Sequence, residues 1–243
     1  MDIKKSFSQY INSKEGKASS LLIILLLSAD FMFIVLHIIH QRTIPILRSP
    51  LYDIGQDLGY GEFYQYMKYF WIILLLIYIL KTTRNIRFIS WILVFVYFLL
   101  DDSLQIHEKI GGLIAKSLPP DPHLGLEDQD YGELIVTGAF GLLFFILLTF
   151  SYWRGSLTFK KISIDLIIFI SALVFFGVFM DMVHDAVKSG WVIEEILGII
   201  EDGGEMVVVS IILWYVFHLA SCRGCTELFL YEQLRKPKTR PVS

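Results

Sequence analysis

LLIILLLSADFMFIVLHII at residues 21–39 is an almost unbroken apolar run, interrupted only by Ser28, Asp30 and His37. A helix rises about 1.5 Å per residue, so about 20 apolar residues cross a hydrocarbon core about 30 Å thick. The run is also longer than the apolar region of a cleaved signal peptide, which has about 7–15 residues. It therefore predicts a helix that spans a membrane.

Five similar runs follow, and all seven prolines lie outside the six runs. Because proline interrupts a helix, this distribution favours continuous helices joined by loops. The predicted spans are 20–40, 63–80, 86–108, 132–152, 162–183 and 195–220. We expect an all-α fold, a polytopic transmembrane six-helix bundle at 20–220, between cytoplasmic segments at 1–19 and 221–243.

The charged residues predict how these spans are oriented. The chain is 55% hydrophobic and only 19% charged, whereas about a quarter of an average soluble domain is charged. If the chain crosses the membrane at each of the six spans, four segments lie on the same side as the N-terminus. These segments, at 4–17, 81–87, 154–161 and 223–240, contain most of the 21 lysines and arginines. Since basic loops tend to face the cytoplasm, both termini are expected there, in a plasma or inner membrane. No basic stripe outside these flanks indicates a nucleic-acid partner.

Acids and histidines gather in the opposite half of the predicted spans. At the i, i+3, i+4 and i+7 spacings that place side chains on one helix face, we find four groups: Asp30 with His37; Asp101 and Glu108 with His107 beside them; Asp181, His184 and Asp185; and Glu201 with Glu205. An ionised group that faces lipid costs several kcal/mol. These faces are therefore expected to point into the bundle, near its outer surface.

One interpretation of this layer is a metal site. Imidazole and carboxylate groups from several helices build metal sites in helix bundles. The candidate ligands are His107, Glu108, Asp181, His184 and Glu205. Zinc, iron or manganese would suit this mixed set, and calcium would suit carboxylates alone. Cys222 and Cys225 are expected to be ordinary thiols on the cytoplasmic side.

The first functional hypothesis is a metal-dependent membrane hydrolase that acts on a lipid-like substrate. The metal would activate water, and Asp101, Asp102 or Glu201 would act as the acid or base. The aromatic, glycine-containing segment 49–66 could cover this site from outside.

Two alternatives belong to other classes. The acidic layer could be the vestibule of a cation channel or transporter, with Gly203 and Gly204 unwinding the last helix and a pore between subunits of a homo-oligomer. However, the cytoplasmic half of the spans appears mostly apolar in sequence, which favours a cup that opens outward. The chain could also be a membrane subunit whose outer vestibule binds a small-molecule ligand or a partner.

Overall fold

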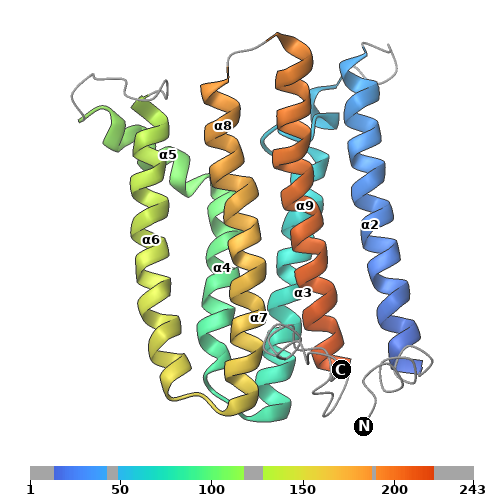
Figure 1. The fold of residues 1–243 in the computed structure, drawn as a ribbon, viewed down its shortest axis with the longest axis vertical. Helices are drawn as coiled ribbons and strands as arrows, with labels where there is room; N and C mark the ends of the chain where they lie inside the picture. The colour runs from blue at the N-terminus through green and yellow to red at the C-terminus, as the bar shows by residue number, and fades with distance from the viewer. Residues whose placement is uncertain (1–13, 43–48, 118–127, 188–189, 222–243) are drawn as a thin grey trace, which may run out of the picture.

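In the computed structural model, residues 14–42, 49–117, 128–187 and 190–221 are described, and the elements that they form are helical. Cys222 and Cys225, and most of the segments predicted at 1–19 and 221–243, lie outside them. The helices form an elongated bundle (Figure 1). The elements are α2 (Lys14–Gln41), η2 (Pro50–Tyr52), α3 (Tyr60–Thr83), α4 (Phe88–Leu104), α5 (Ile106–Ala115), α6 (Asp128–Trp153), α7 (Leu157–Val174), η3 (Phe175–Met180), α8 (Asp181–Ala186) and α9 (Trp191–Ser221).

The core lies among α3, α4, α7 and α9. Helix α3 packs against both α4 and α9, and α7 also contacts α9. Ile72, Leu76, Trp91, Leu166 and Ile212 are fully excluded from solvent there. Helices α2 and α6 lie at opposite edges (Figure 1) and contribute little to this core.

The long helices are apolar on their outer surfaces as well. On α6, Leu142 is 61% exposed and Phe145 is 68% exposed. Four helical stretches are long and apolar enough to cross a membrane: Gly16–Gln41, Tyr60–Thr83, Gln129–Trp153 and Leu157–His184. The pair Phe88–Leu104 and Ile106–Ala115 is a fifth if it counts as one bent span. These helices indicate an integral membrane protein.

The sixth predicted span, 195–220, lies in α9. This helix is long enough to cross a membrane, but it is not among the candidate spans found by length and apolarity. Its first half carries Glu194, Glu195, Glu201, Asp202 and Glu205. The helix is continuous through Gly203 and Gly204, so the unwinding considered under the channel or transporter alternative is absent at this pair. Ile34 and Phe176 pack close to the two glycines.

The third predicted span, 86–108, is not one straight helix. Gln105 adopts a left-handed backbone conformation with φ 52°, and α5 leaves α4 at 67°. The sequence had predicted Asp101 and Glu108 on one helix face, but they belong to two helices that meet at this bend. After the bend, α5 packs on α6 so closely that a Cβ at Gly132 would meet the backbone of Gly111.

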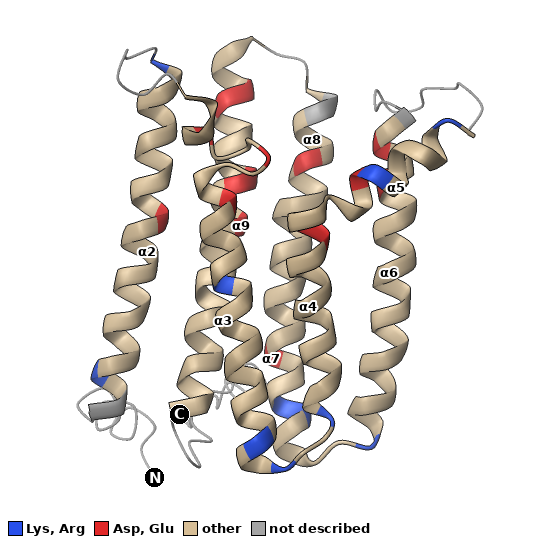
Figure 2. Ribbon diagram, turned by 180° about the vertical axis from the view of Figure 1, so that it is seen from behind, with Lys and Arg blue, Asp and Glu red and all other residues tan. Residues whose placement is uncertain are grey.

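Charge divides the bundle into two ends (Figure 2). We call the end near Lys17, Lys81, Arg87 and Lys160 the basic end and the opposite end, near Asp181 and Glu201, the acidic end. The half of the bundle nearer the basic end was predicted to be mostly apolar, and it contains a buried polar contact. Asp165 is fully buried there, and the Tyr215 hydroxyl donates a hydrogen bond of 2.7 Å to it.

Candidate functional site

A polar cavity of about 370 Å³ opens within the acidic end of the bundle. Helices α3, α4, α5, α6 and α9 contribute to its wall, together with η3, α8 and the loop before α3. Its acidic and histidine residues are Asp57, Glu62, Asp102, His107, Glu108, Glu133, Asp181, Glu201, Asp202 and Glu205. Among the described residues that line it, none is a lysine or arginine. The cavity is therefore a concentrated negative site within an apolar bundle.

Helix α9 supplies three of these carboxylates. Glu201 and Glu205 are one helical turn apart, and Asp202 follows Glu201 directly. The loop before α3 comes so close to α9 that a Cβ at Gly55 would lie 2.8 Å from Oδ2 of Asp202. A side chain at position 55 would therefore displace the Asp202 carboxylate.

Glu205 lies where η3 interrupts the regular α7–α8 helix. The segment Phe175–Met180 is π-helical, and such segments occur often at functional sites. A Cβ at Gly177 would collide with the Glu205 carboxylate. Glycine is thus the residue that leaves room for this carboxylate against the helix.

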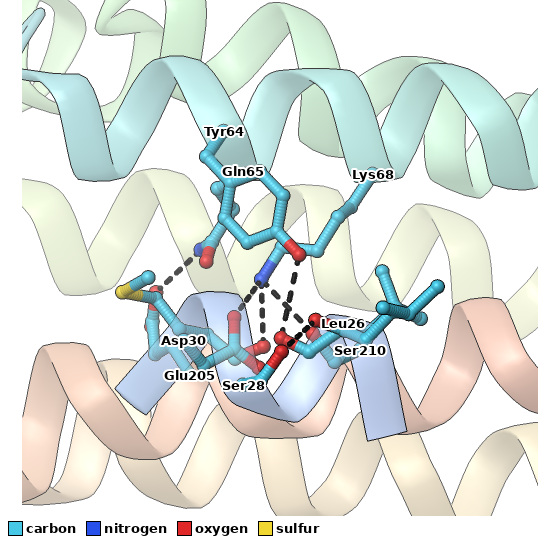
Figure 3. Close-up of polar contacts among 10 residues, drawn as sticks. Leu26, Ser28, Asp30, Tyr64, Gln65, Lys68, Glu205 and Ser210 are labelled. Atoms are coloured by element: carbon cyan, nitrogen blue, oxygen red, sulfur yellow. Dashed lines mark hydrogen bonds and ion pairs between the residues drawn. The ribbon is translucent and has the colours of Figure 1, made fainter. Parts of the chain in front are cut away.

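Gln65 of α3 also contacts Glu205. Its Nε2 donates a hydrogen bond of 3.2 Å to Oε2 of Glu205 (Figure 3). Gln65 is only 7% exposed, and its Oε1 is buried without a hydrogen-bond partner within the described structure. An acceptor left unpaired in this way costs about 1–3 kcal/mol.

Two histidines pair with carboxylates at the cavity. Nδ1 of His184 lies 2.8 Å from Oε2 of Glu201. Nδ1 of His107 lies 3.1 Å from Oδ2 of Asp101. The other carboxylate oxygen of Asp101 accepts a 2.9 Å hydrogen bond from the His107 backbone N–H. Asp101 therefore caps the start of α5 and fixes the bend, a role that its predicted assignment as an acid or base did not include.

Lys68 and Asp30 lie below this cavity, towards the basic end. Nζ of Lys68 donates to Oδ1 of Asp30 at 3.1 Å, to the Met206 carbonyl at 2.7 Å and to Oγ of Ser210 at 3.3 Å (Figure 3). Both charged side chains are essentially inaccessible. Asp30 was predicted to belong to the acidic layer. The structure instead pairs it with Lys68 as a buried ion pair.

His37 fastens the loop at 49–59 to α2. Its Nδ1 lies 3.1 Å from Oδ1 of Asp53, and the Ile54 backbone N–H approaches the same nitrogen at 3.4 Å. The hydrogen bond with His37 lowers the pKa of the Asp53 carboxyl below its ordinary value, although burial opposes this effect. Ile54, Gly55 and Asp57 of the same loop line the cavity, so His37 positions part of its wall.

The predicted metal ligands are only partly brought together. Four of them line the cavity, namely His107, Glu108, Asp181 and Glu205. His184 does not line it but contacts Glu201, which does. Across the described residues, no three histidine, cysteine or acidic side chains form a group that could hold a metal ion. The side chain of Asp185 lies outside the described part of the chain.

Sequence reasoning missed several members of the site, namely Asp57, Glu62, Gln65, Glu133 and Asp202. One signal was present: Glu62, Gln65, Tyr66 and Tyr69 repeat at helical spacing along one face of α3. Glu133 carried no such signal, because α6 reaches the cavity only through the bend between α4 and α5.

The fold and site together define a multispan helical membrane protein with an acidic cavity at one end. A family model described as "Domain of unknown function (DUF8692)" matches residues 20–221. The chain belongs to this family. Neither the curated proteins nor the solved structures include a significant match to it.

Proposed function

We propose that this chain is an integral membrane protein whose acidic cavity binds a small cation from the outer side. In this arrangement α9 is the sixth span, both termini lie in the cytoplasm, and the acidic end faces outward. The segregation of basic residues to the opposite end supports this orientation (Figure 2). Membrane lipid is the expected partner of the exposed apolar faces.

The observation that carries the proposal is the charge of the cavity wall. Carboxylates from α3, α4, α5, α6, α8, α9 and the 49–59 loop surround one space of about 370 Å³. Like charges so close together in a poorly polarisable environment repel strongly. A bound cation would relieve that repulsion.

The spacing of the carboxylates favours one type of cation. A fully dehydrated metal needs several ligand atoms at about 2.0–2.6 Å, and the described residues offer no group of three that meets this need. A cation that keeps its water shell, or one that carries its own N–H donors, fits a wider cavity. Carboxylates can bind either kind through charge-assisted hydrogen bonds.

The buried ion pair favours binding over conduction. The Lys68 ammonium lies one helical turn along α3 from the cavity-lining Gln65, on the side of the basic end. A cation that moved further into the bundle would have to pass the Lys68–Asp30 pair, whose two side chains are almost fully buried. The cation pathway considered from the sequence is therefore the less favoured function.

A hydrolase remains a second candidate because of the His184–Glu201 pair. A histidine held by a carboxylate is the usual arrangement for proton transfer, and Asp181 lines the same cavity as Glu201. Hydrolysis of lipid esters or amides that Glu201→Gln abolishes, while cation binding persists, would favour this candidate.

Thermal unfolding in lipid nanodiscs tests the proposed function. Mg²⁺, Ca²⁺, Mn²⁺, Zn²⁺ and methylammonium would be added separately at constant ionic strength. Because a ligand of the native state raises its stability, at least one cation should raise the Tm of the wild type. Glu205→Gln should remove that increase.

Glu194→Gln is the matched control. Glu194 lies on the same helix but is exposed and does not line the cavity, so this variant should keep the increase. If no cation shifts the Tm, or if Glu194→Gln and Glu205→Gln behave alike, the proposal is wrong.

A further inference from the structure

A second cavity, of about 150 Å³, adjoins the acidic one. The two share six lining residues: Asp102, His107, Glu133, Gly177, Asp181 and Glu205. The carboxylates of Asp181 and Glu205 thus stand at the junction between the two spaces. A single ligand could occupy both.

The walls of the second cavity are chemically different. Tyr69, Phe98, Leu173, Val178 and Met182 line it but not the first. Asp101, Asp130 and Thr137 also line only the second cavity, so its wall is mixed, with the apolar residues in the majority. A cavity of about 150 Å³ is large enough for a group of about the size of benzene. This space therefore fits an apolar group of about six carbons.

Gln65, which lines the acidic cavity and contacts Glu205 of the junction, carries a buried acceptor that a ligand could satisfy. Gln65 lines the acidic cavity, and its Nε2 is already engaged with Glu205. Its Oε1 has no hydrogen-bond partner in the described structure. A carbonyl oxygen beside a carboxylate is a suitable pair of acceptors for the N–H groups of an ammonium.

We propose that the natural ligand is a primary amine with an apolar group of about six carbons. The ammonium contacts Glu205, Asp181 and Gln65 Oε1, and the apolar group enters the second cavity. This inference rests on the proposed function, because it specifies which cation the acidic cavity takes.

Calorimetric titration of the full chain in phosphatidylcholine nanodiscs tests it, with empty nanodiscs subtracted. The probes are hexylammonium, methylammonium and hexanol. Because each buried methylene adds to the affinity, hexylammonium should bind at least about tenfold more tightly than methylammonium. Hexanol lacks the charge and should bind at least about tenfold more weakly than hexylammonium.

Two variants separate the contributions of the ammonium and the apolar group. Val178→Phe fills the second cavity, so hexylammonium should fall to the affinity of methylammonium while methylammonium binds as before. Gln65→Leu removes the acceptor and should weaken both amines. Val192→Phe makes the same exchange at an exposed position of α9 that lines neither cavity, and it should change nothing. If Gln65→Leu does not fold, Val178→Phe still decides the result.

The possible failures are distinguishable. If methylammonium binds as tightly as hexylammonium, or if Val178→Phe leaves hexylammonium unaffected, the amine inference is wrong but the cation cavity stands. If hexanol binds as tightly as hexylammonium, the charge is irrelevant and the inference is likewise wrong. If none of the cations tested in either experiment binds, the proposed function fails together with it.

Discussion

Nζ of Lys68 and Oδ1 of Asp30 lie 3.1 Å apart, and both side chains are excluded from the surface of the protein. The lysine donates two further hydrogen bonds, to the Met206 carbonyl and to Ser210. This contact joins α2, α3 and α9 through charge in an otherwise apolar part of the bundle.

Removing one partner of this pair should destabilise the protein strongly. Lys68→Met leaves the Asp30 carboxylate buried without compensation, which costs about 3–5 kcal/mol. The double variant Asp30→Leu/Lys68→Met removes both charges and should recover most of that loss. The measurement is equilibrium unfolding of the detergent-solubilised protein. Lys81→Met, at an exposed position, is the control, and equal losses in the single and double variants would contradict the account.

Gly177 should tolerate no side chain. A Cβ at this position would collide with the Glu205 carboxylate, so Gly177→Ala should cost about 1–3 kcal/mol through overpacking and weaken cation binding. At Gly138 a Cβ would meet nothing within 4 Å. Gly138→Ala should therefore be neutral or stabilising by up to about 1 kcal/mol. Thermal unfolding of both variants checks this, and equal stability in the two would show that the close contact is not present.

Asp202→Asn should stabilise the protein while it weakens the binding of its ligand. The substitution removes one of several like charges around the cavity. Reducing charge repulsion in this way commonly raises the free energy of unfolding by about 0.5–2 kcal/mol. The Tm without ligand should rise, and the increase produced by a bound cation should shrink. A variant that loses stability without ligand would show that the carboxylates do not repel one another in the native state.

The contact of Asp53 with His37 should make the stability of the loop depend on pH. The pKa of Asp53 is lowered in the folded state, so its contribution is fully present above the unfolded-state pKa. That contribution is lost as pH falls through the lower, folded-state value. The difference in Tm between wild type and Asp53→Asn should be constant near neutral pH and shrink in acid. A difference in Tm that grows as the pH falls would contradict a lowered pKa of Asp53 in the folded state.

The role of Asp101 as the acceptor of the His107 N–H hydrogen bond should be separable from the role of its charge. Asn can still accept the hydrogen bond from the His107 N–H, whereas Ala cannot, and loss of such a cap costs about 0.5–2 kcal/mol. We therefore expect Asp101→Ala to be less stable than Asp101→Asn. Spin labels at the exposed residues Leu100 and Leu113 should report a change in the α4–α5 bend in Asp101→Ala alone. Identical behaviour of the two variants would exclude the capping role.

Much of the helical architecture was predictable because long apolar runs without proline carry the information locally. The two deviations involve contacts that cross a helix boundary. At the bend, Asp101 accepts a hydrogen bond from the backbone of His107 across a turn that is not helical. In the π-helical segment, Gly177 leaves room for Glu205 of a distant helix. Neither contact could be predicted from the helical spacing of one segment.

The sequence predicted that the site is a layer of polar residues, but it did not predict which side chains pair within that layer. Helical spacing predicted that Asp181, Glu201 and Glu205 belong to one polar layer, and Asp102 was predicted as an acid or base. All four line the cavity. It could not indicate that Lys68 neutralises Asp30, because the rotation of α3 against α2 determines that pairing. It also gave no sign of Glu133, which reaches the cavity only because α4 and α5 bend.

Equilibrium dialysis of a cation against the purified chain at constant ionic strength tests the central claim most directly. The cation is the one that gives the largest increase in Tm. The account predicts one bound cation per chain for wild type and for Glu194→Gln. It predicts none for the triple variant Glu201→Gln/Asp202→Asn/Glu205→Gln, provided that the variant unfolds cooperatively at a Tm no lower than that of wild type. Stoichiometric binding that survives in this folded triple variant would contradict it.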